Sequence, residues 1–218
     1  MPKRDNDFYV LLGPDYAGKS TVLSALATGS QWQLISVDEN LLHPRHALLG
    51  TLRRHLVEDV LAAPPGTYSD QFAFAMMQCA VVHLHDRIRA AAPGAPLLVD
   101  SYYYKILAKC RLVGAGDHPI FTWWRTLPAP QHVVYLDVSP ETAWRRSGFG
   151  SRLNPMEQRD AAVATGEPYA DFATFQIALR AAMLDEIADV PVTVVHEQPG
   201  VAETVAAVRK VLQDSDVA

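Results

Sequence analysis

The chain has 218 residues, of which 49% are hydrophobic and 20% are charged, and its formal net charge at pH 7 is −5. This length suits one α/β domain with a sizeable core. The net negative charge gives no indication of a nucleic-acid partner, and no apolar run approaches the roughly 18 residues that a membrane-spanning helix needs. The residues before the first expected strand do not have the pattern of a secretory leader. We therefore expect a cytoplasmic protein that acts on small molecules.

Five short apolar runs alternate along the chain with longer segments of helical pattern. Continuous hydrophobicity of this kind is typical of strands that are buried on both faces of a parallel sheet. The expected strands cover residues 8–12, 33–37, 96–99, 132–138 and 192–195. Because parallel strands need crossover connections, the intervening helices should cover both faces of the sheet, which gives a three-layer α/β fold.

Proline and glycine mark where the intervening helices begin and end. The expected helices cover residues 19–28, 44–62, 69–92, 102–113, 119–127, 169–189 and 202–212. One more helix should follow Ser139-Pro140-Glu141, a cap followed by proline and by an acid in the first turn, and should fade within residues 147–151. No repeat or linker interrupts this series, so we expect residues 1–218 to form a single domain.

The first strand and the first helix are joined by a segment that fits the pattern G-x-x-x-x-G-K-S/T without a mismatch. Such a loop wraps its backbone N–H groups around a β-phosphate, its lysine reaches the β- and γ-phosphates, and its hydroxyl ligates Mg²⁺. The following helix presents the positive end of its dipole to the same anion. The pattern predicts a site for a nucleoside triphosphate and Mg²⁺ that is made by Gly13, Asp15, Ala17, Gly18, Lys19, Ser20 and Thr21.

Acidic side chains follow three of the expected strands, at the edge of the sheet where ligands of open α/β sheets bind. Asp100 can hold the Mg²⁺ shell together with Ser20, or take the proton of an acceptor hydroxyl, and it can also cap the next helix. Asp38 and Glu39 can act as a base, hold an acceptor hydroxyl, or be ordinary loop acids. For Asp137 we expect a structural role, since it lies just before a helix.

A second group of charged residues surrounds the glycine-rich segment after the fourth strand. Arginines that stand among glycines are typical of a mobile lid that closes over a triphosphate, stabilises the migrating phosphoryl group and excludes water. The alternative is a solvated surface with ordinary arginines. We favour a lid over about residues 145–160, with arginines at Arg145, Arg146, Arg152 and Arg159.

Three further features indicate no metal or redox chemistry. Cys79 and Cys110 lie in apolar helical surroundings and are expected to be buried free thiols. His83 and His85 are two residues apart on one helix, a spacing that does not place them on a common face. Most of the aromatic side chains near the expected acceptor side should belong to the core, although one or two of them could stack on a planar ring.

The chain resembles the thymidylate kinases, within the wider group of nucleoside and nucleotide kinases. The resemblance is carried by the phosphate loop, by Val99-Asp100-Ser101-Tyr102, and by the run from Tyr135 to Ala143, and it extends over nearly the whole chain. It implies a sheet of strand order 2-3-1-4-5, transfer of the γ-phosphoryl group of ATP to a small acceptor, and a possible homodimer. It further implies that Asp15 lies near the acceptor's sugar hydroxyl, and that the catalytic residues include Lys19, Asp100, Arg146 and Arg152.

Two departures from the family pattern leave the acceptor open. Ser101 stands where the family has an arginine that grips the acceptor's phosphate, and the segment 74–78 lacks a second arginine. Losing both clamps should weaken the binding of a nucleoside monophosphate unless other cations, such as Arg53 or Arg54, replace them. The acceptor is therefore a nucleotide, a nucleoside, or another small hydroxyl compound such as an antibiotic or a biosynthetic intermediate. A nucleotide-dependent switch without an acceptor is the less favoured alternative. The candidate acceptor contacts are Asp15, Glu39, Arg54, Gln78 and Tyr102.

Overall fold

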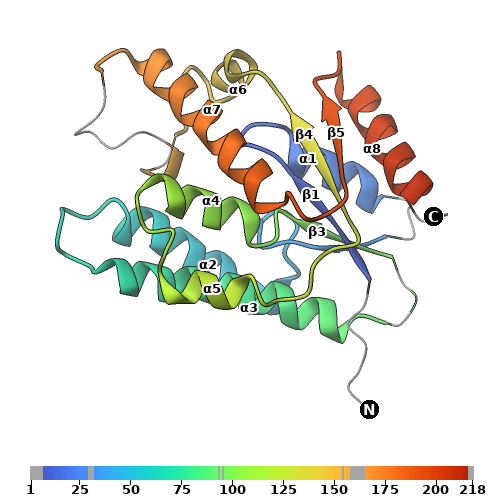
Figure 1. Ribbon diagram of the computed structural model, residues 1–218, viewed down its shortest axis with the longest axis horizontal. Coiled ribbons are helices and arrows are strands. Elements are labelled where there is room, and N and C mark those ends of the chain that lie inside the picture. Colours follow the sequence, from blue (N-terminus) through green and yellow to red (C-terminus); the bar gives the residue numbers. More distant parts are fainter. Residues whose placement is uncertain are drawn as a thin grey trace.

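A five-stranded parallel sheet forms the middle layer of the protein, and helices cover both of its faces (Figure 1). The computed structural model describes residues 7–28, 32–92, 94, 96–153, 155–157 and 165–215. The spatial order is β2-β3-β1-β4-β5, as the resemblance implies. The strands are β1 (Phe8–Leu12), β2 (Gln33–Ile35), β3 (Leu97–Asp100), β4 (His132–Asp137) and β5 (Val192–His196).

The central strand β1 shows why a continuous apolar run suits this position. Its residues alternate between two separate cores: Phe8, Val10 and Leu12 pack on one face of the sheet, and Tyr9 and Leu11 pack on the other. Every residue of β1 is at most 2% exposed. Because all the strands are parallel, their carboxyl ends meet at one edge, where the acidic residues that end β3 and β4 also lie.

The helices divide between the two faces of the sheet. The core on the side of α1 and α8 is the smaller one, while the other core is formed with α3, α4, α5 and α7 (Figure 1). α2 contacts α3. The helices are α1 (Lys19–Ala27), α2 (Ala47–His55), α3 (Asp70–Ala90), α4 (Tyr104–Leu112), α5 (Pro119–Trp124), α6 (Pro140–Arg146), α7 (Pro168–Glu186) and α8 (Val201–Ser215).

Local capping explains where two of the predicted helices begin. The Ser69 side chain accepts a hydrogen bond from the backbone N–H of Phe72 at 3.2 Å, and the Ser139 side chain accepts one from Thr142 at 3.1 Å. Each bond satisfies a backbone donor that has no partner within its helix. The sequence prediction of both helix starts is confirmed to within one residue.

The segment predicted as one helix over residues 44–62 consists of three pieces. A 3₁₀ turn, η1 (Pro44–His46), precedes α2, and a π-helical turn, η2 (Leu56–Val60), follows it. In η2 the backbone N–H of Leu61 donates to the carbonyl of Leu56 at 2.9 Å, five residues earlier. A π turn holds one residue more than an α-helical turn, so it changes the direction of the side chains around it. The periodicity of the sequence does not indicate this change.

Two other predictions differ from the structure. The helix expected from residue 102 begins at Tyr104, because Ser101 and Tyr102 both have positive φ values, of 57° and 48°, which an α-helix does not allow. Cys79, expected to be buried, is exposed on α3, whereas Cys110 is a buried free thiol as expected. A helix with an apolar pattern exposes part of its circumference, and Cys79 lies on that part.

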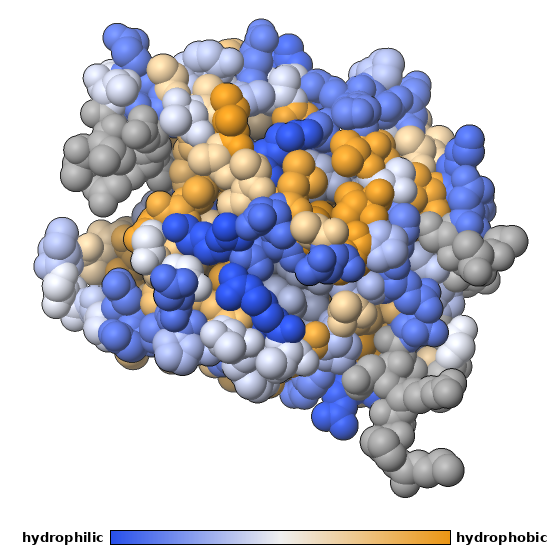
Figure 2. All heavy atoms as spheres, in the orientation of Figure 1, coloured by the Kyte–Doolittle hydropathy of each residue, from blue (hydrophilic) through white to orange (hydrophobic). Residues whose placement is uncertain are grey.

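The face of the protein in Figure 2 is mostly hydrophilic. Hydrophilic side chains cover most of the face shown in Figure 2, and hydrophobic ones gather toward its middle. None of the helices in the described part of the chain combines the length and the apolar character needed to cross a membrane.

Candidate functional site

The phosphate loop closes around its own lysine. The Nζ of Lys19 donates to the carbonyl oxygens of Gly13 at 2.9 Å and of Pro14 at 2.6 Å. Gly18 precedes α1 with a φ of 93°, a conformation that favours glycine. At Gly13 a Cβ atom would lie 2.6 Å from the carbonyl oxygen of Leu136 on β4, so only glycine allows this close approach of the loop to the sheet. The loop is thus held ready to surround an anion.

A buried cluster of one acid and two lysines lies beside the loop. The Nζ of Lys105 is 2.9 Å from one carboxylate oxygen of Asp15, and the Nζ of Lys109 is 2.6 Å from the other. The two lysines are four residues apart on α4 and therefore share a face of that helix. Sequence analysis missed both of them. The signal that was available is their spacing of four, directly after the acid that ends β3.

The charges of this cluster and of the nearby Lys19 shift one another's pKa values. Burial and the nearby Lys105 ammonium lower the pKa of Lys19 to about 7, although Asp15 and Asp100 act in the opposite direction. Burial acts to raise the pKa of Asp15, but the ammonium groups of Lys105 and Lys109 outweigh it and hold this pKa far below its usual range. Lys19, which lies next to this cluster, can therefore change its charge near neutral pH when a ligand binds.

Hydroxyl and carboxylate groups meet on the other side of the loop. The Ser20 hydroxyl donates to Oδ2 of Asp38 at 2.8 Å, and Asp100 accepts hydrogen bonds from the hydroxyls of Ser36 at 2.8 Å and Ser101 at 2.9 Å. Burial acts to raise the pKa of Asp38, but hydrogen bonds from Ser20 and Asn40 lower it. Oxygen donors of this kind, few in number, suit Mg²⁺, which takes its remaining ligands from water and phosphates. Asp38 thus lies beside Ser20, one of the two residues predicted to hold Mg²⁺.

The predicted lid residues reach back to the loop. The Tyr16 hydroxyl lies 2.7 Å from the carbonyl oxygen of Arg152 and 3.0 Å from Oε2 of Glu157. Nη1 of Arg146 donates to the carbonyl of Tyr16 at 3.2 Å, and the Arg152 guanidinium donates to the carbonyl of Arg146. Glu157 lies in a short 3₁₀ turn, η3 (Pro155–Glu157), and is itself buried. No sequence pattern indicates that Glu157 belongs to the site.

Of the other two arginines of the predicted lid, the structure describes Arg145, which contacts its own helix. Nη2 of Arg145 donates to the Thr142 hydroxyl at 3.3 Å, within α6. Arg159 lies outside the described residues. Gly148 and Gly150 have φ values of 71° and 87°, and a Cβ atom at Gly150 would lie 2.5 Å from the ring of Trp144. These glycines therefore let the chain turn tightly over Trp144 and carry Arg152 to the loop.

One cavity of about 690 Å³ connects the phosphate loop with a second wall formed by α2, η2 and α3. Its polar side contains the loop, the lysines of α4 and the lid arginines. Its other side is apolar. A volume of this size is typical of small-molecule sites. The residues of the polar side are Asp15, Tyr16, Gly18, Lys19, Ser20, Thr21, Asp38, Asn40, Asp100, Ser101, Lys105, Lys109, Arg146, Arg152 and Glu157.

Of the predicted acceptor contacts, Asp15 and Tyr102 line the cavity, but the Tyr102 side chain is only 1% exposed. Arg54 and Glu39 pair with each other at 3.1 Å outside the cavity lining. The oxygen of Gln78 accepts a hydrogen bond from the indole N–H of Trp124, and Gln78 does not line the cavity either. Arg53, the neighbour of Arg54, does line it. Arg53, and not the predicted contact Arg54, is thus the arginine of α2 that lines the cavity.

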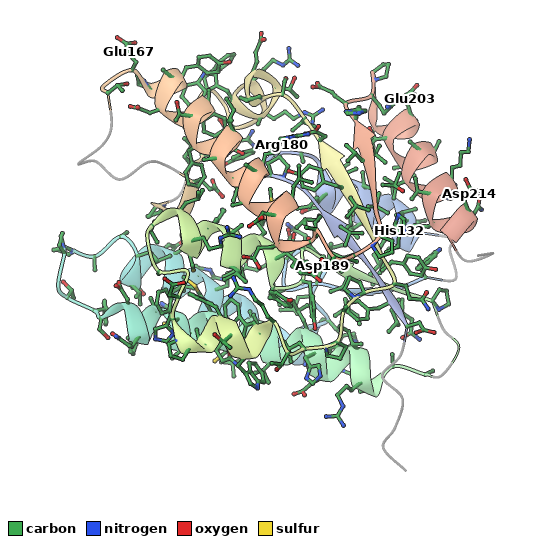
Figure 3. All side chains as sticks on the ribbon, viewed as in Figure 1. His132, Glu167, Arg180, Asp189, Glu203 and Asp214 are labelled. Carbon is green, nitrogen blue, oxygen red and sulfur yellow. The ribbon has the colours of Figure 1, made fainter. Side chains whose placement is uncertain are left out.

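Asp137 lies at the same edge of the sheet and has a structural partner. Its two carboxylate oxygens accept hydrogen bonds from Nε and Nη2 of Arg180 at 2.8 and 2.9 Å. Figure 3 shows Arg180 on the side of α7 that is turned toward β4. This bidentate pair ties α7 to the end of β4, which agrees with the structural role expected for Asp137.

The sheet order, the phosphate loop and the cavity beside it define the fold of the thymidylate-kinase-like P-loop kinases. Among solved structures with this fold, thymidylate kinase from Candida albicans has a TM-score of 0.61 and 16% identity over 97% of this chain and 93% of that chain. Deoxyadenosine kinase from M. mycoides, with dCMP and dCDP bound, has a TM-score of 0.60 and 16% identity over 94% of this chain and 98% of that chain. No protein-family description and no curated protein matches the chain.

Proposed function

We propose that the protein is an ATP- and Mg²⁺-dependent kinase that transfers the γ-phosphoryl group to a small acceptor. The observation that carries this proposal is the single cavity that runs from the phosphate loop to the wall of α2 and α3. A nucleotide switch needs room for its nucleotide alone. This cavity extends beyond the loop to the wall of α2, η2 and α3, where an acceptor can lie next to the γ-phosphate. The fold of thymidylate and deoxyadenosine kinases supports the same conclusion.

The residues of the polar side have distinct roles in this reaction. Lys19, Arg146 and Arg152 stabilise the negative charge that spreads over the migrating group. Ser20 and Asp38, which contact each other at 2.8 Å, would hold Mg²⁺, and the ion would supply charge neutralisation at the phosphates. The lid contacts through Tyr16 exclude water, which otherwise competes with the acceptor.

Asp100 is the best-placed base for an acceptor hydroxyl. It lines the cavity and is held by two serine hydroxyls, whereas Asp15 is neutralised by two lysines and Glu39 lies outside the cavity lining. The acceptor oxygen forms the new bond to the γ-phosphorus while the bond to the oxygen of ADP breaks. The hydroxyl proton passes to Asp100 and then to solvent. A phosphate acceptor would need no such base, because its oxygen is already ionised.

The proposal is tested by following ADP release from ATP and Mg²⁺ with nucleoside, nucleotide and aliphatic hydroxyl compounds as acceptors. We expect acceptor-dependent ADP release that Lys19→Ala abolishes. Slow ATP hydrolysis that no small molecule changes, and that a protein partner stimulates, would overturn the kinase proposal. Full activity of Lys19→Ala would overturn the assignment of the loop itself.

A further inference from the structure

We infer that the acceptor has an aliphatic, non-aromatic body and carries an anionic group, and that Arg53 recognises this group. The inference rests on the proposed function and specifies the acceptor that the cavity takes. It depends on two observations. One is the composition of the apolar wall, and the other is that Arg53 is exposed and forms no ion pair with any described residue.

The wall opposite the phosphate loop is made of aliphatic and thioether side chains from three consecutive elements and α4. Its residues are Leu49, Leu52, Leu56, Val57, Met76, Met77, Ala80 and Ile106. They offer dispersion contacts to any apolar body and no hydrogen bond. Cys79 also lines the cavity, and its thiol donates to the carbonyl of Ala75 at 3.5 Å within α3.

Within the described part of the chain, two aromatic residues line the cavity, Tyr16 and Tyr102. Tyr102 is buried and packs edge-on against Phe8, with ring centroids 5.3 Å apart. The Tyr16 hydroxyl is taken up by the lid contacts to Arg152 and Glu157. The amide of Asn40 donates to Asp38 at 3.0 Å.

A nucleobase would therefore enter this wall with its polar edge unpaired. Each buried donor or acceptor that loses water without gaining a partner opposes binding, and a base presents several of them. An alkyl chain has no such groups, and its transfer from water to the wall is favourable along its whole length. The wall therefore selects an aliphatic body over a planar heterocycle.

Arg53 supplies the recognition of charge. It is exposed, lines the cavity and forms no ion pair with any described residue, whereas Lys105 and Lys109 are already paired with Asp15. Arg53 stands in the cavity lining with Asp38, and its positive charge helps to lower the pKa of that carboxyl. A guanidinium presents a fork of donors that fits a carboxylate or a phosphate. An anionic group on the acceptor can thus bind Arg53 while its hydroxyl points to Asp100.

The test measures binding by calorimetry in the presence of Mg²⁺ and a non-hydrolysable ATP analogue. The probes are omega-hydroxyhexanoate, hydroxyhexyl phosphate, hexanediol, dTMP and deoxyadenosine. We expect at least one of the two anionic alkyl compounds to bind about tenfold more tightly than hexanediol, dTMP and deoxyadenosine. The anionic alkyl compound that binds more tightly shows whether the site prefers a carboxylate or a phosphate. In Arg53→Gln this preference over hexanediol should vanish, while Arg209→Gln, an equal charge change at an exposed residue of α8, should keep it.

Equal or tighter binding of dTMP or deoxyadenosine than of both anionic alkyl compounds would overturn the inference, as would an Arg53→Gln variant that keeps the preference for the anion. These outcomes differ from a failure of the proposed function. If the ATP analogue does not bind, or if none of the five probes releases ADP from ATP, the kinase proposal is overturned. ADP release with dTMP alone would support the kinase proposal and overturn the aliphatic acceptor.

Discussion

The Nζ of Lys109 lies 2.6 Å from Oδ2 of Asp15, so an ion pair joins the phosphate loop to α4. Both side chains are almost completely buried, with 9% and 11% of their surface exposed. A buried charge that loses its partner costs more than the pair contributes. The pair therefore fixes the position of the loop relative to the wall on which an acceptor would lie.

Asp15→Asn should lower the free energy of unfolding by about 3 kcal/mol at neutral pH, because it removes the nearest counter-ion of two buried lysines and leaves Lys109 only the more distant Glu157, at 3.9 Å. The low pKa of Asp15 in the folded protein means that its contribution is present above the unfolded value of about 3.9 and is lost as the pH falls below it. Urea denaturation at neutral and acidic pH measures both effects. Adding Lys109→Met to Asp15→Asn should restore part of the loss, and equal stability of Asp15→Asn and the unchanged protein at pH 7 would contradict the argument.

Nucleotide binding should take up about one proton at pH 8 and almost none at pH 6. The pKa of Lys19 is about 7 in the free protein, so this lysine is largely neutral at pH 8 and largely charged at pH 6. Phosphates favour the charged form and raise its pKa. Calorimetry of ADP binding in buffers with different ionisation enthalpies gives the number of protons. Lys19→Met should abolish the uptake at pH 8, and uptake at pH 6 in its place would show that another group titrates.

Arg146→Gln should lower kcat by about a hundredfold, because it removes a charge that faces the migrating phosphoryl group. Arg146 lines the cavity and contacts the loop at Tyr16. Its neighbour Arg145 contacts Thr142 and provides the matched control, so Arg145→Gln should change kcat by less than about threefold. Steady-state kinetics with a saturating acceptor measures both variants. Similar losses in the two would mean that net charge, and not position, accounts for the effect.

Tyr16→Phe should loosen the lid while leaving the loop intact. The substitution removes the hydroxyl that contacts Arg152 and Glu157, a loss of about 1 kcal/mol. Amide hydrogen exchange of residues 147–153 should become faster, whereas exchange in α1 should not change. Tyr169→Phe, at an exposed tyrosine on α7, is the control and should leave both regions as they are. Unchanged exchange in Tyr16→Phe would show that the hydroxyl does not hold the lid.

The sequence predicted the strands of the sheet well because these depend on local and repeated signals. Each of these signals has a direct physical cause. They are the five apolar runs, the turn residues between them and the phosphate-loop pattern. The resemblance to thymidylate kinases then supplied the order of the strands. The ends of the elements shifted by a few residues where backbone conformation decides, as at Ser101 and Tyr102.

The partners within the site depend on tertiary structure and could not be predicted. Arg53 and Arg54 are consecutive residues of one helix and therefore point about 100° apart, so a correct helix still leaves open which one enters the cavity. Likewise, the pairing of Asp15 with lysines some 90 residues later depends on how α4 lies against the loop. Glu157 lies in a short turn without a sequence pattern that would have identified it.

The π turn η2 has a consequence for how the acceptor side of this fold can change. Leu56 and Val57, which begin this turn, both line the cavity, and a π turn differs from an α-helical turn by one inserted residue. Removing a residue would restore regular α-helical winding, and every side chain that follows on the helix would turn by about 100°. The part of the wall that η2 contributes can thus receive different side chains through a change in chain length, with the phosphate loop and the lid left as they are.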